Sequence, residues 1–258
     1  MPGMDDFGAT PRKALPIFYL LDTSGSMYGT PIGTLNSAMG ETMEALKDLA
    51  KSNADAQLKI GVLEFNSSVR WKNPGGLQDV EDFFYEDLEA GGMTCMGDAL
   101  KELNSKLSRH AFLDSIAGNL MPIIIVMSDG YANDEYLKPL EEIKKNRWFK
   151  RATKIGFAIG DDADLEMLAK IVGDSEAVIK TTDMSMFSKL IKFVSVTSSM
   201  LVSTSSTSET APSAADIVAQ AKTEVDGGSD VQTAGDQGVY VEPDPVEDDE
   251  DGWGDDWE

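Results

Sequence analysis

The chain of 258 residues is poor in the side chains that most nucleophilic, redox and zinc chemistry requires. It has one cysteine, Cys95, which excludes an intramolecular disulfide and a cysteine-rich zinc site. The single histidine, His110, lies in the segment SRHAF at the expected end of a helix, so a surface position is predicted. Without a nearby histidine, Cys95 is interpreted as a small buried residue. These shortages predict a protein that is not an enzyme and has no catalytic residues.

Positive charge is also scarce, and the C-terminal end has none. The formal net charge is −23, and residues 224–258 contain fourteen acidic side chains without a Lys or Arg, which leaves −9 for residues 1–223. Nucleic-acid binding requires a basic surface, and anionic membranes repel an acidic one. The composition therefore predicts neither a nucleic-acid partner nor a membrane partner.

Long apolar runs are missing as well. The first thirteen residues, MPGMDDFGATPRK, contain acids and no apolar segment, and the apolar stretch over 14–21 is too short for a signal peptide core or a membrane span. A cytoplasmic protein is expected, with residues 1–13 as an N-terminal extension.

The apolar residues that are present alternate between strand and helix patterns over residues 14–200. Short apolar runs bounded by Gly or Asp indicate buried strands, and amphipathic stretches with Pro or Asp at their start indicate helices. This alternation predicts an α/β fold with a doubly wound, mostly parallel sheet and one antiparallel hairpin strand. Strands are predicted at 17–22, 58–66, 69–71, 121–129, 153–160 and 177–180, the last at an edge, and helices at 31–51, 97–113, 135–147, 164–173 and 185–200.

The regular alternation stops near residue 200, where the domain is expected to end. Residues 201–223 are rich in Ser, Thr and Ala and are predicted to be a linker, with at most one short helix over 215–225. Residues 224–258 are acidic and Gly-rich, with too little apolar content to offset the entropy of ordering, so a disordered tail is expected.

Two tryptophans in the acidic tail need a separate explanation. Trp253 and Trp257 lie beside Asp255, Asp256 and Glu258. Acidic runs are usually solvated, but tryptophan is enriched at binding hot spots. The tail is therefore predicted to contain a short motif that docks on a basic partner.

Two of the predicted strands end in an aspartate followed by turn-forming residues. Asp22 ends the run FYLLD and is followed by Ser24 and Ser26, while Asp129 ends IIIVMSD. Ligands of open α/β sheets bind beyond the carboxyl ends of the strands, so these residues are expected at one rim together with Thr94 from GGMTCM. Such an oxygen-only set suits Mg²⁺, with Mn²⁺ or Ca²⁺ as alternatives. The competing interpretation is that the aspartates and serines only stabilise turns.

The three motifs DTSGS, GGMT and SDG, in this order and strand context, resemble those of the von Willebrand factor type A domain. In that family the corresponding residues form the metal-ion-dependent adhesion site (MIDAS). The resemblance assigns Asp22, Ser24 and Ser26 to the D-x-S-x-S motif, Thr94 to the distant threonine and Asp129 to the distant aspartate. It implies a bound divalent ion whose open coordination position accepts an Asp or Glu side chain of a partner protein.

A narrower resemblance covers about residues 12–200. The segments DTSGSMYGTPIGTLNSAM, IGDDADLEMLAKI and MFSKLIKFVS resemble those of bacterial TerY-like proteins of tellurite-resistance and stress loci. This resemblance implies a scaffold in a phosphorylation system, with a Ser/Thr kinase and a PP2C-type phosphatase as partners. The Ser/Thr cluster over 203–209 is then a candidate kinase target.

Alternative functions stay open at this point. A metal-dependent phosphohydrolase and an adaptor of an AAA+ ATPase are the two alternatives to the scaffold. For the tail, a second hypothesis places one of its carboxylates at this chain's own metal site or at that of a neighbouring copy.

Overall fold

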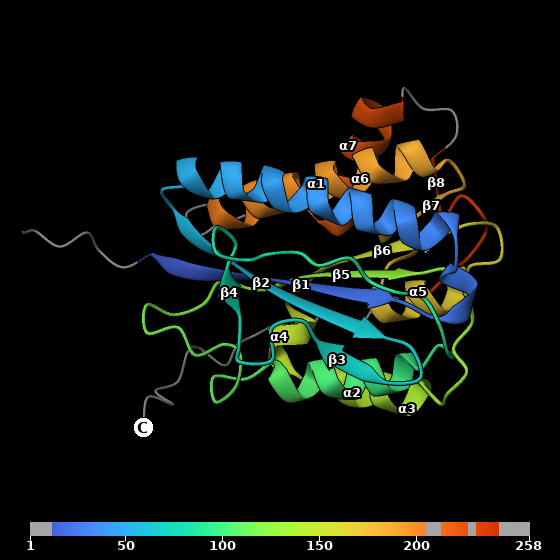
Figure 1. The fold of residues 1–258 in the computed structure, drawn as a ribbon, viewed down its shortest axis with the longest axis horizontal. Helices are drawn as coiled ribbons and strands as arrows, with labels where there is room; N and C mark the ends of the chain where they lie inside the picture. The colour runs from blue at the N-terminus through green and yellow to red at the C-terminus, as the bar shows by residue number, and fades with distance from the viewer. Residues whose placement is uncertain (1–11, 205–212, 227–230, 243–258) are drawn as a thin grey trace, which may run out of the picture.

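The predicted parallel sheet lies at the centre of the molecule (Figure 1). The computed structural model describes residues 12–204, 213–226 and 231–242. Within these residues the parallel strands follow the spatial order β2 (Ala56–Phe65), β1 (Lys13–Asp22), β5 (Ile123–Ser128), β6 (Thr153–Ile159) and β7 (Val178–Thr181). The apolar run of β5 is buried in the middle of the sheet, as predicted. The doubly wound α/β fold is therefore confirmed.

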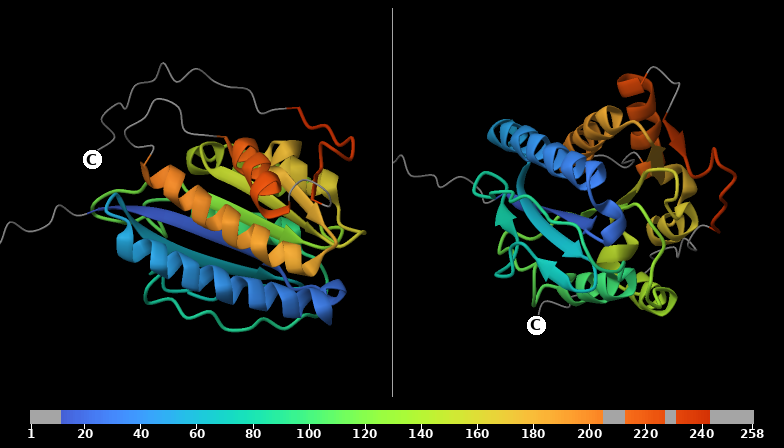
Figure 2. Two further views of the ribbon diagram at one scale, coloured as in Figure 1. Left: turned by 90° about the horizontal axis from the view of Figure 1, so that it is seen from above. Right: turned by 45° about the vertical axis from the view of Figure 1, so that its right-hand side comes forward.

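Helices cover both faces of this sheet (Figures 1 and 2). Successive side chains of a strand point to opposite faces. Thus Tyr19 and Leu21 of β1 belong to one core cluster, and Phe18 and Leu20 belong to the other. The first face is covered by α1 (Thr30–Ser52), α6 (Met184–Thr204) and α7 (Ala214–Asp226), and the second by α2 (Met96–Lys106), α3 (Leu137–Lys144), α4 (Arg147–Lys150) and α5 (Leu165–Val172).

The apolar composition of the long helix α6 is explained by its burial in this core. By length and hydropathy alone its segment Ser185–Thr204 could cross a membrane. In the fold, however, α6 lies beside α1 on the sheet and buries Phe187, Leu190 and Val194 (Figure 2). Burial against a sheet is sufficient to explain an apolar stripe of this kind.

The edges of the sheet are more elaborate than the sequence indicates. The predicted hairpin strand is present as β3 (Val69–Trp71), antiparallel to β2. Two further short antiparallel strands also occur, β4 (Gln78–Asp79) on β2 and β8 (Gln232–Thr233) on β7. The edge position predicted for residues 177–180 is therefore wrong, because β8 lies outside β7.

The packed structure also continues past the boundary predicted near residue 200. Helix α6 runs to Thr204, and α7 occupies the position of the one short helix allowed within the expected linker. Ile217, Val218 and Ala221 of α7 are buried against α6. Strand β8, which lies in the segment expected to be the tail, pairs with β7 and so belongs to the sheet. These few apolar side chains stabilise α7 because they pack on the apolar surface of α6. A sequence pattern does not reveal this contact. Residues 243–258, with both tail tryptophans and their acidic neighbours, lie outside the described residues.

Two predicted helices are shorter than expected. Helix α2 ends at Lys106, after which the chain continues to Leu113 in turns. The helix predicted over 135–147 is split into α3 and α4 at Asn146, whose side chain accepts a hydrogen bond from Trp148 N at 2.9 Å. Asparagine often competes with helical hydrogen bonding in this way, which accounts for the break.

Candidate metal centre

The reversal of strand order between β1 and β5 places two loops of distant sequence side by side. After β1 the chain moves outward to β2, whereas β5, β6 and β7 extend on the other side. Residues Leu21 and Met127 are paired across β1 and β5, so Asp22, the last residue of β1, and Asp129, which follows β5, lie at neighbouring strand ends. Such a switch point is where open α/β sheets bind ligands.

Four of the five predicted residues form a continuous chain of hydrogen bonds at this point. The Oδ1 atom of Asp22 accepts from Ser24 N at 2.8 Å. The Ser24 and Ser26 hydroxyl oxygens lie 3.0 Å apart, and Ser26 Oγ donates to Asp129 Oδ1 at 2.8 Å. The structure thus brings Asp22, Ser24, Ser26 and Asp129 together from two loops.

The fifth residue, Thr94, is buried between these loops by backbone contacts. Its N–H donates to Asn133 Oδ1 at 2.8 Å, and Asn133 N donates back to Thr94 O at the same distance. Two further bonds, Gly91 N to Thr23 O and Gly25 N to Gly92 O, attach its loop to the loop of Asp22. In the described structure, the Thr94 hydroxyl makes no hydrogen bond to the Asp22–Asp129 chain.

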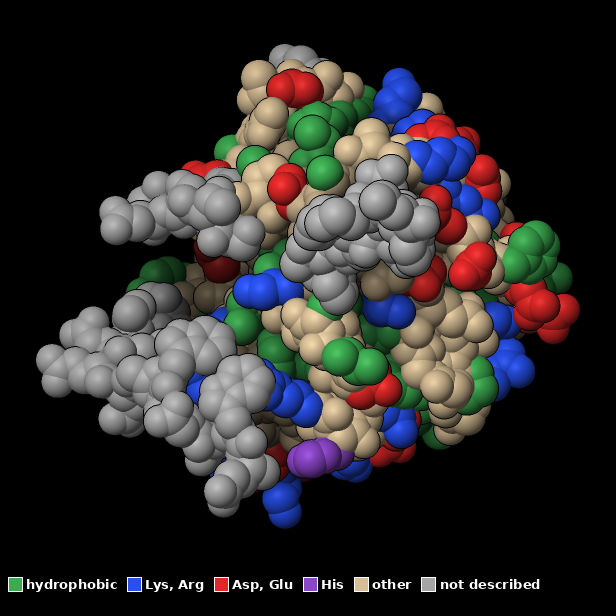
Figure 3. Space-filling model, turned by 90° about the vertical axis from the view of Figure 1, so that its left-hand side faces the viewer, with side chains coloured by type: hydrophobic (Ala, Val, Ile, Leu, Met, Phe, Trp, Pro, Cys, Tyr) green, Lys and Arg blue, Asp and Glu red, His purple; other side chains and the backbone are tan. Residues whose placement is uncertain are grey.

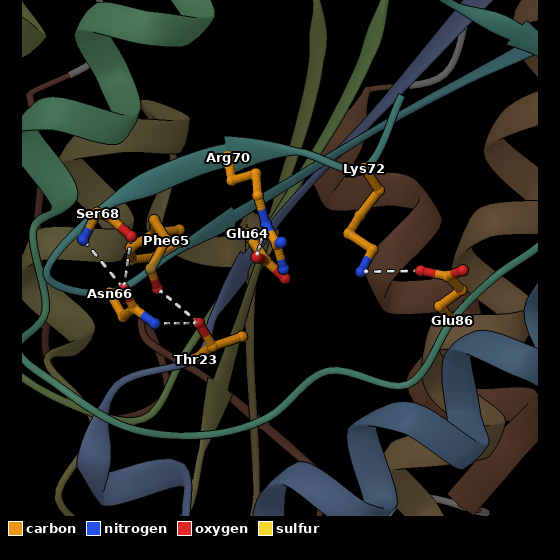
Figure 4. Close-up of polar contacts among 8 residues, drawn as sticks. All are labelled: Thr23, Glu64, Phe65, Asn66, Ser68, Arg70, Lys72 and Glu86. Atoms are coloured by element: carbon orange, nitrogen blue, oxygen red, sulfur yellow. Dashed lines mark hydrogen bonds and ion pairs between the residues drawn. The ribbon is translucent and has the colours of Figure 1, made fainter. Parts of the chain in front are cut away.

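The loop after β2 is hydrogen-bonded to the loop that carries Asp22 (Figure 4). The N–H and hydroxyl of Thr23 both donate to Phe65 O, at 2.9 and 3.3 Å. Asn66 Nδ2 donates to Thr23 Oγ1 at 3.2 Å, while Asn66 O accepts from Cys95 N. Asn66 also closes the turn into β3, because its Oδ1 accepts from Ser68 N at 3.0 Å. The loops that carry Asp22 and Thr94 are therefore joined through Asn66.

Sequence reasoning missed three polar residues of this site. Ser128 Oγ donates to Asp22 Oδ2 at 2.6 Å, while Asn133 and Asn66 hold the loops together. Ser128 could have been found, because it directly precedes Asp129 in the predicted strand. The two asparagines carry no such signal, since their partners lie far away in the sequence.

The two carboxylates of the site, those of Asp22 and Asp129, have no cationic partner among the described residues. Burial raises the pKa of Asp22, although hydrogen bonds from Ser128 and Ser24 oppose the shift. Burial also raises the pKa of Asp129, with a further contribution from the charge of Asp22, against the hydrogen bond from Ser26. Among the described residues neither carboxylate forms a salt bridge. Two carboxylates, three hydroxyls and no protein cation are a donor set that fits a hard divalent ion.

A family comparison agrees with this arrangement. The model of the von Willebrand factor type A domain matches residues 17–193, a range that contains all five predicted site residues. The chain belongs to the von Willebrand factor type A (VWA) family. Helix α7 and strand β8 lie beyond the matched range, so they are additions to the VWA domain in this chain.

Solved structures share the VWA fold at low sequence identity. Proximal thread matrix protein 1 from the mussel byssus, with a zinc-occupied MIDAS motif, is 21% identical with a TM-score of 0.52, over 70% of this chain and 47% of that one. A von Willebrand factor type A protein from Catenulispora acidiphila is 18% identical with a TM-score of 0.54, over 72% and 42%. The chain thus spans less than half the length of these structures. Comparison with curated proteins gives no match.

Cys95 and His110 lie in different surroundings in this VWA domain. Cys95 is buried just after Thr94, and burial together with the charges of Asp134 and Asp98 raises its pKa. A protonated thiol is a poor nucleophile. His110 is exposed beyond the far end of α2, a helix of 11 residues and about 16 Å that starts at the metal loops. Both positions match the sequence-based predictions.

The acidic residues near Thr94 have a structural role. Oxygen and sulfur atoms of Cys95, Asp98 and Asp134 lie within 4.8 Å of one another. Both carboxylate oxygens of Asp134, however, accept hydrogen bonds at 3.0 Å from Gly97 N and Asp98 N, in the first turn of α2. Of Asp162 and Asp164, the two acids that could cap the helix by sequence, Asp164 caps α5 by accepting from Met167 N at 2.9 Å. These carboxylates stabilise helix starts and do not extend the metal centre.

Exposed apolar side chains flank the metal loops of the VWA domain. Tyr28 follows the loop of Ser26 and is 81% exposed, and Tyr131 follows Asp129 and is 66% exposed. Met93, one residue before Thr94, is 55% exposed. Large exposed side chains of this kind are typical of protein-binding surfaces.

Proposed function

We propose that this VWA domain is a Mg²⁺-dependent protein-interaction module. Asp22, Ser24, Ser26, Thr94 and Asp129 hold the ion, and a carboxylate of the partner protein completes its coordination. The observation that carries the proposal is the pair of buried carboxylates joined by serine hydroxyls at the switch point, without a protein cation. VWA domains mediate protein binding, and the mussel byssus relative has been solved with zinc at its MIDAS motif.

The residues of the site have separate tasks in this proposal. Ser128 and the Ser24 N–H hold the Asp22 carboxylate in a fixed orientation, so little ordering is required when the ion binds. Ser26 connects the two loops and keeps Asp129 beside the serines. The neutral hydroxyls leave the ion incompletely neutralised, which favours an external anionic oxygen. Tyr28, Tyr131 and Met93 then provide the apolar contact around it.

For the biological setting we propose a cytoplasmic scaffold in a bacterial phosphorylation or stress-response system of the tellurite-resistance type. The motifs that resemble TerY-like proteins support this setting, and they point to a Ser/Thr kinase and a PP2C-type phosphatase as partners. The tail residues Trp253, Trp257, Asp255, Asp256 and Glu258 provide a second binding motif in this proposal.

The metal-binding step is tested by thermal melts of the full-length protein with chelator or with Mg²⁺. An ion at about 100 times its Kd stabilises the folded state by about 2.7 kcal/mol, or about 5–10 °C in a domain of this size. Wild type and Asp161→Ala, which removes an exposed carboxylate at the end of β6, are expected to show this shift. Asp22→Ala is expected to lose it. An equal shift in Asp22→Ala would contradict the proposed ligand set.

The interaction step is tested by affinity purification with and without chelator, again with Asp22→Ala and Asp161→Ala. Kinase or phosphatase partners are expected to be lost on chelation and in Asp22→Ala only. Recovery of an AAA+ ATPase instead would favour the adaptor function. Metal-dependent turnover of a phosphate ester that Asp22→Ala abolishes would favour a phosphohydrolase.

A further inference from the structure

Positive charge in this acidic chain is concentrated in one short segment. Residues 144–154, KKNRWFKRATK, contain six Lys or Arg and no acid, in a chain of net charge −23. They form the end of α3, all of α4 and the beginning of β6. Because they precede β6, they lie at the amino end of the sheet, opposite the metal loops.

The end of α2 adds two further cations to this region. Asn146 Nδ2 donates to Asn104 Oδ1 at 2.9 Å and to Leu107 O at 3.1 Å, which fixes the start of α4 beside the end of α2. Figure 3 looks onto the amino end of the sheet, where several Lys and Arg side chains lie near the single histidine, His110, with some Asp and Glu side chains among them. We call this surface the basic end, and it comprises Lys106, Arg109, Lys144, Lys145, Arg147, Lys150, Arg151 and Lys154.

Three lysines of the basic end have local partners. Lys154 Nζ donates to Phe149 O at 3.0 Å and to Lys150 O at 3.4 Å, so Lys154 caps the end of α4. Lys145 pairs with Glu142 at 2.8 Å, and Lys106 with Glu102 at 3.4 Å. Residues 144–154 themselves contribute six positive charges and no negative one.

The opposite end of the VWA domain has the reverse charge. The segments 22–37, 89–100, 128–137, 159–169 and 181–188 lie at or next to the carboxyl ends of the strands, and they contain eleven acids and no Lys or Arg. Lys180 of β7 is a cation at this end, since its Nζ donates to Asp161 O at 3.2 Å. A strongly acidic peptide is therefore repelled at the metal loops and attracted at the basic end.

We propose that the acidic C-terminal segment, residues 243–258, binds the basic end of its own chain. This segment contains nine acids and no cation, and its Trp253 and Trp257 can stack on Lys or Arg groups. The described chain ends at residue 242 on the face of the sheet that α4 covers, because Val239 and Val241 pack against the core cluster that includes Phe149. Sixteen residues span up to about 50 Å, and a tether of this length gives a high effective concentration.

This contact keeps the segment away from the metal centre. Among the tail hypotheses it replaces the one in which a tail carboxylate occupies the metal site. The metal loops then remain open to an acidic group of a partner protein, while a basic partner would compete for the segment itself.

Zero-length carbodiimide cross-linking of the full-length protein, followed by mass spectrometry, tests the contact. Equal amounts of unlabelled and ¹⁵N-labelled chains are mixed, so that links within one chain differ in mass from links between two. Carboxylates of residues 243–258 are expected to join Lys144, Lys145, Lys150 or Lys154 within one chain. Links spread over exposed lysines elsewhere, such as Lys51 and Lys101, would overturn the proposal, and links only between chains would assign the segment to a second copy.

A charge-reversal pair sharpens the test because it removes no reactive lysine from the basic end. Arg147→Glu with Arg151→Glu is expected to lower the yield of these links about five- to tenfold, since each exposed pair contributes a few-fold in binding. The control pair Lys51→Glu with Lys192→Glu, on α1 and α6, is expected to leave the yield unchanged. An unchanged yield in the arginine pair would overturn the proposal.

Salt provides a second readout that needs no variant. At about 0.5 M NaCl the screening length falls to about 4 Å, so the yield of these links in the wild type is expected to fall severalfold. A yield that does not respond to salt would contradict an electrostatic contact, even if the arginine variant failed to fold.

Discussion

At the scale of single residues, the Asp22 carboxylate links the fold to the proposed function. It is fully buried at the end of β1 and accepts hydrogen bonds from Ser128 Oγ and Ser24 N. These bonds fix its orientation, but burial still raises its pKa. In the absence of a cation, the charged form of Asp22 therefore destabilises the folded state, and a bound ion would offset this cost.

The substitution Asp22→Asn should separate the destabilising effect of the buried charge from the stabilising effect of a bound ion. Because the pKa of Asp22 is raised in the folded state, its protonated form favours folding, and that contribution is lost as the pH rises through the folded pKa. With chelator at neutral pH, Asp22→Asn should therefore melt a few °C above the wild type, and the difference should close as the pH falls.

The control for this prediction is the same pair of melts in Mg²⁺, where the order should reverse because asparagine lacks the charge that holds the ion. Asp129 is present in both proteins, so its own titration cancels. Identical melting temperatures at every pH with chelator would contradict the role assigned to buried charge.

Gly92 is a second residue on which the site depends. Its φ angle is +85°, and an added Cβ would lie 2.6 Å from Ser67 Oγ, which accepts from Met93 N. Gly92→Ala is therefore expected to cost about 1–3 kcal/mol in the free energy of unfolding and to weaken Mg²⁺ binding through the displaced Thr94 loop.

Gly91→Ala is the matched control, since a Cβ there would meet no atom within 4 Å. Its cost is expected to stay near 0.5 kcal/mol. Denaturant unfolding and a Mg²⁺ titration measure both effects, and equal behaviour of the two alanine variants would show that the Gly92 conformation does not matter.

At the scale of elements, the C-terminal additions are the main departure from the sequence pattern. Strand β8 is held on β7 by backbone pairing, by Thr233 Oγ1 donating to Glu176 Oε2 at 2.8 Å, and by the ion pair of Lys222 with Asp236. Elements whose ends are marked by local sequence signals, such as a cap residue or a glycine, are predicted better than these additions. Helix α5 begins at its Asp164 cap and ends at Gly173, whose φ is +82°. Helix α7 also begins at a local cap, since Asp216 N donates to Ser213 Oγ at 3.2 Å and Ser213 N donates to Asp216 Oδ2 at 2.9 Å, but its apolar side chains are buried against α6.

Truncation of a buried side chain in α7 tests whether this helix belongs to the folded unit. Ile217 is 1% exposed, so Ile217→Ala is expected to lower the free energy of unfolding by about 2–4 kcal/mol. Gln220→Ala, on the exposed side of the same helix, should change it by less than about 0.5 kcal/mol. Denaturant unfolding followed by circular dichroism gives both values, and an unchanged Ile217→Ala would place α7 outside the cooperative core.

At the scale of the whole molecule, the two ends of the sheet carry opposite charge. The metal loops are acidic and flanked by Tyr28, Tyr131 and Met93, whereas the basic end gathers cations from α2, α3 and α4. An ion at the metal loops and an acidic peptide at the basic end would therefore bind without competing. The proposed scaffold thus has two binding surfaces on opposite ends of one VWA domain.

The sequence by itself determined the strand and helix order, the doubly wound sheet and the residues that end β1 and β5. These features follow from short-range patterns, because apolar periodicity and helix caps depend on neighbouring residues. Only the tertiary structure decided that Ser128 orients Asp22, that Asn66 joins the site loops, and that α7 and β8 complete the domain. These contacts join residues far apart in the chain, and their partners are chosen by burial and strand pairing, which no local pattern encodes.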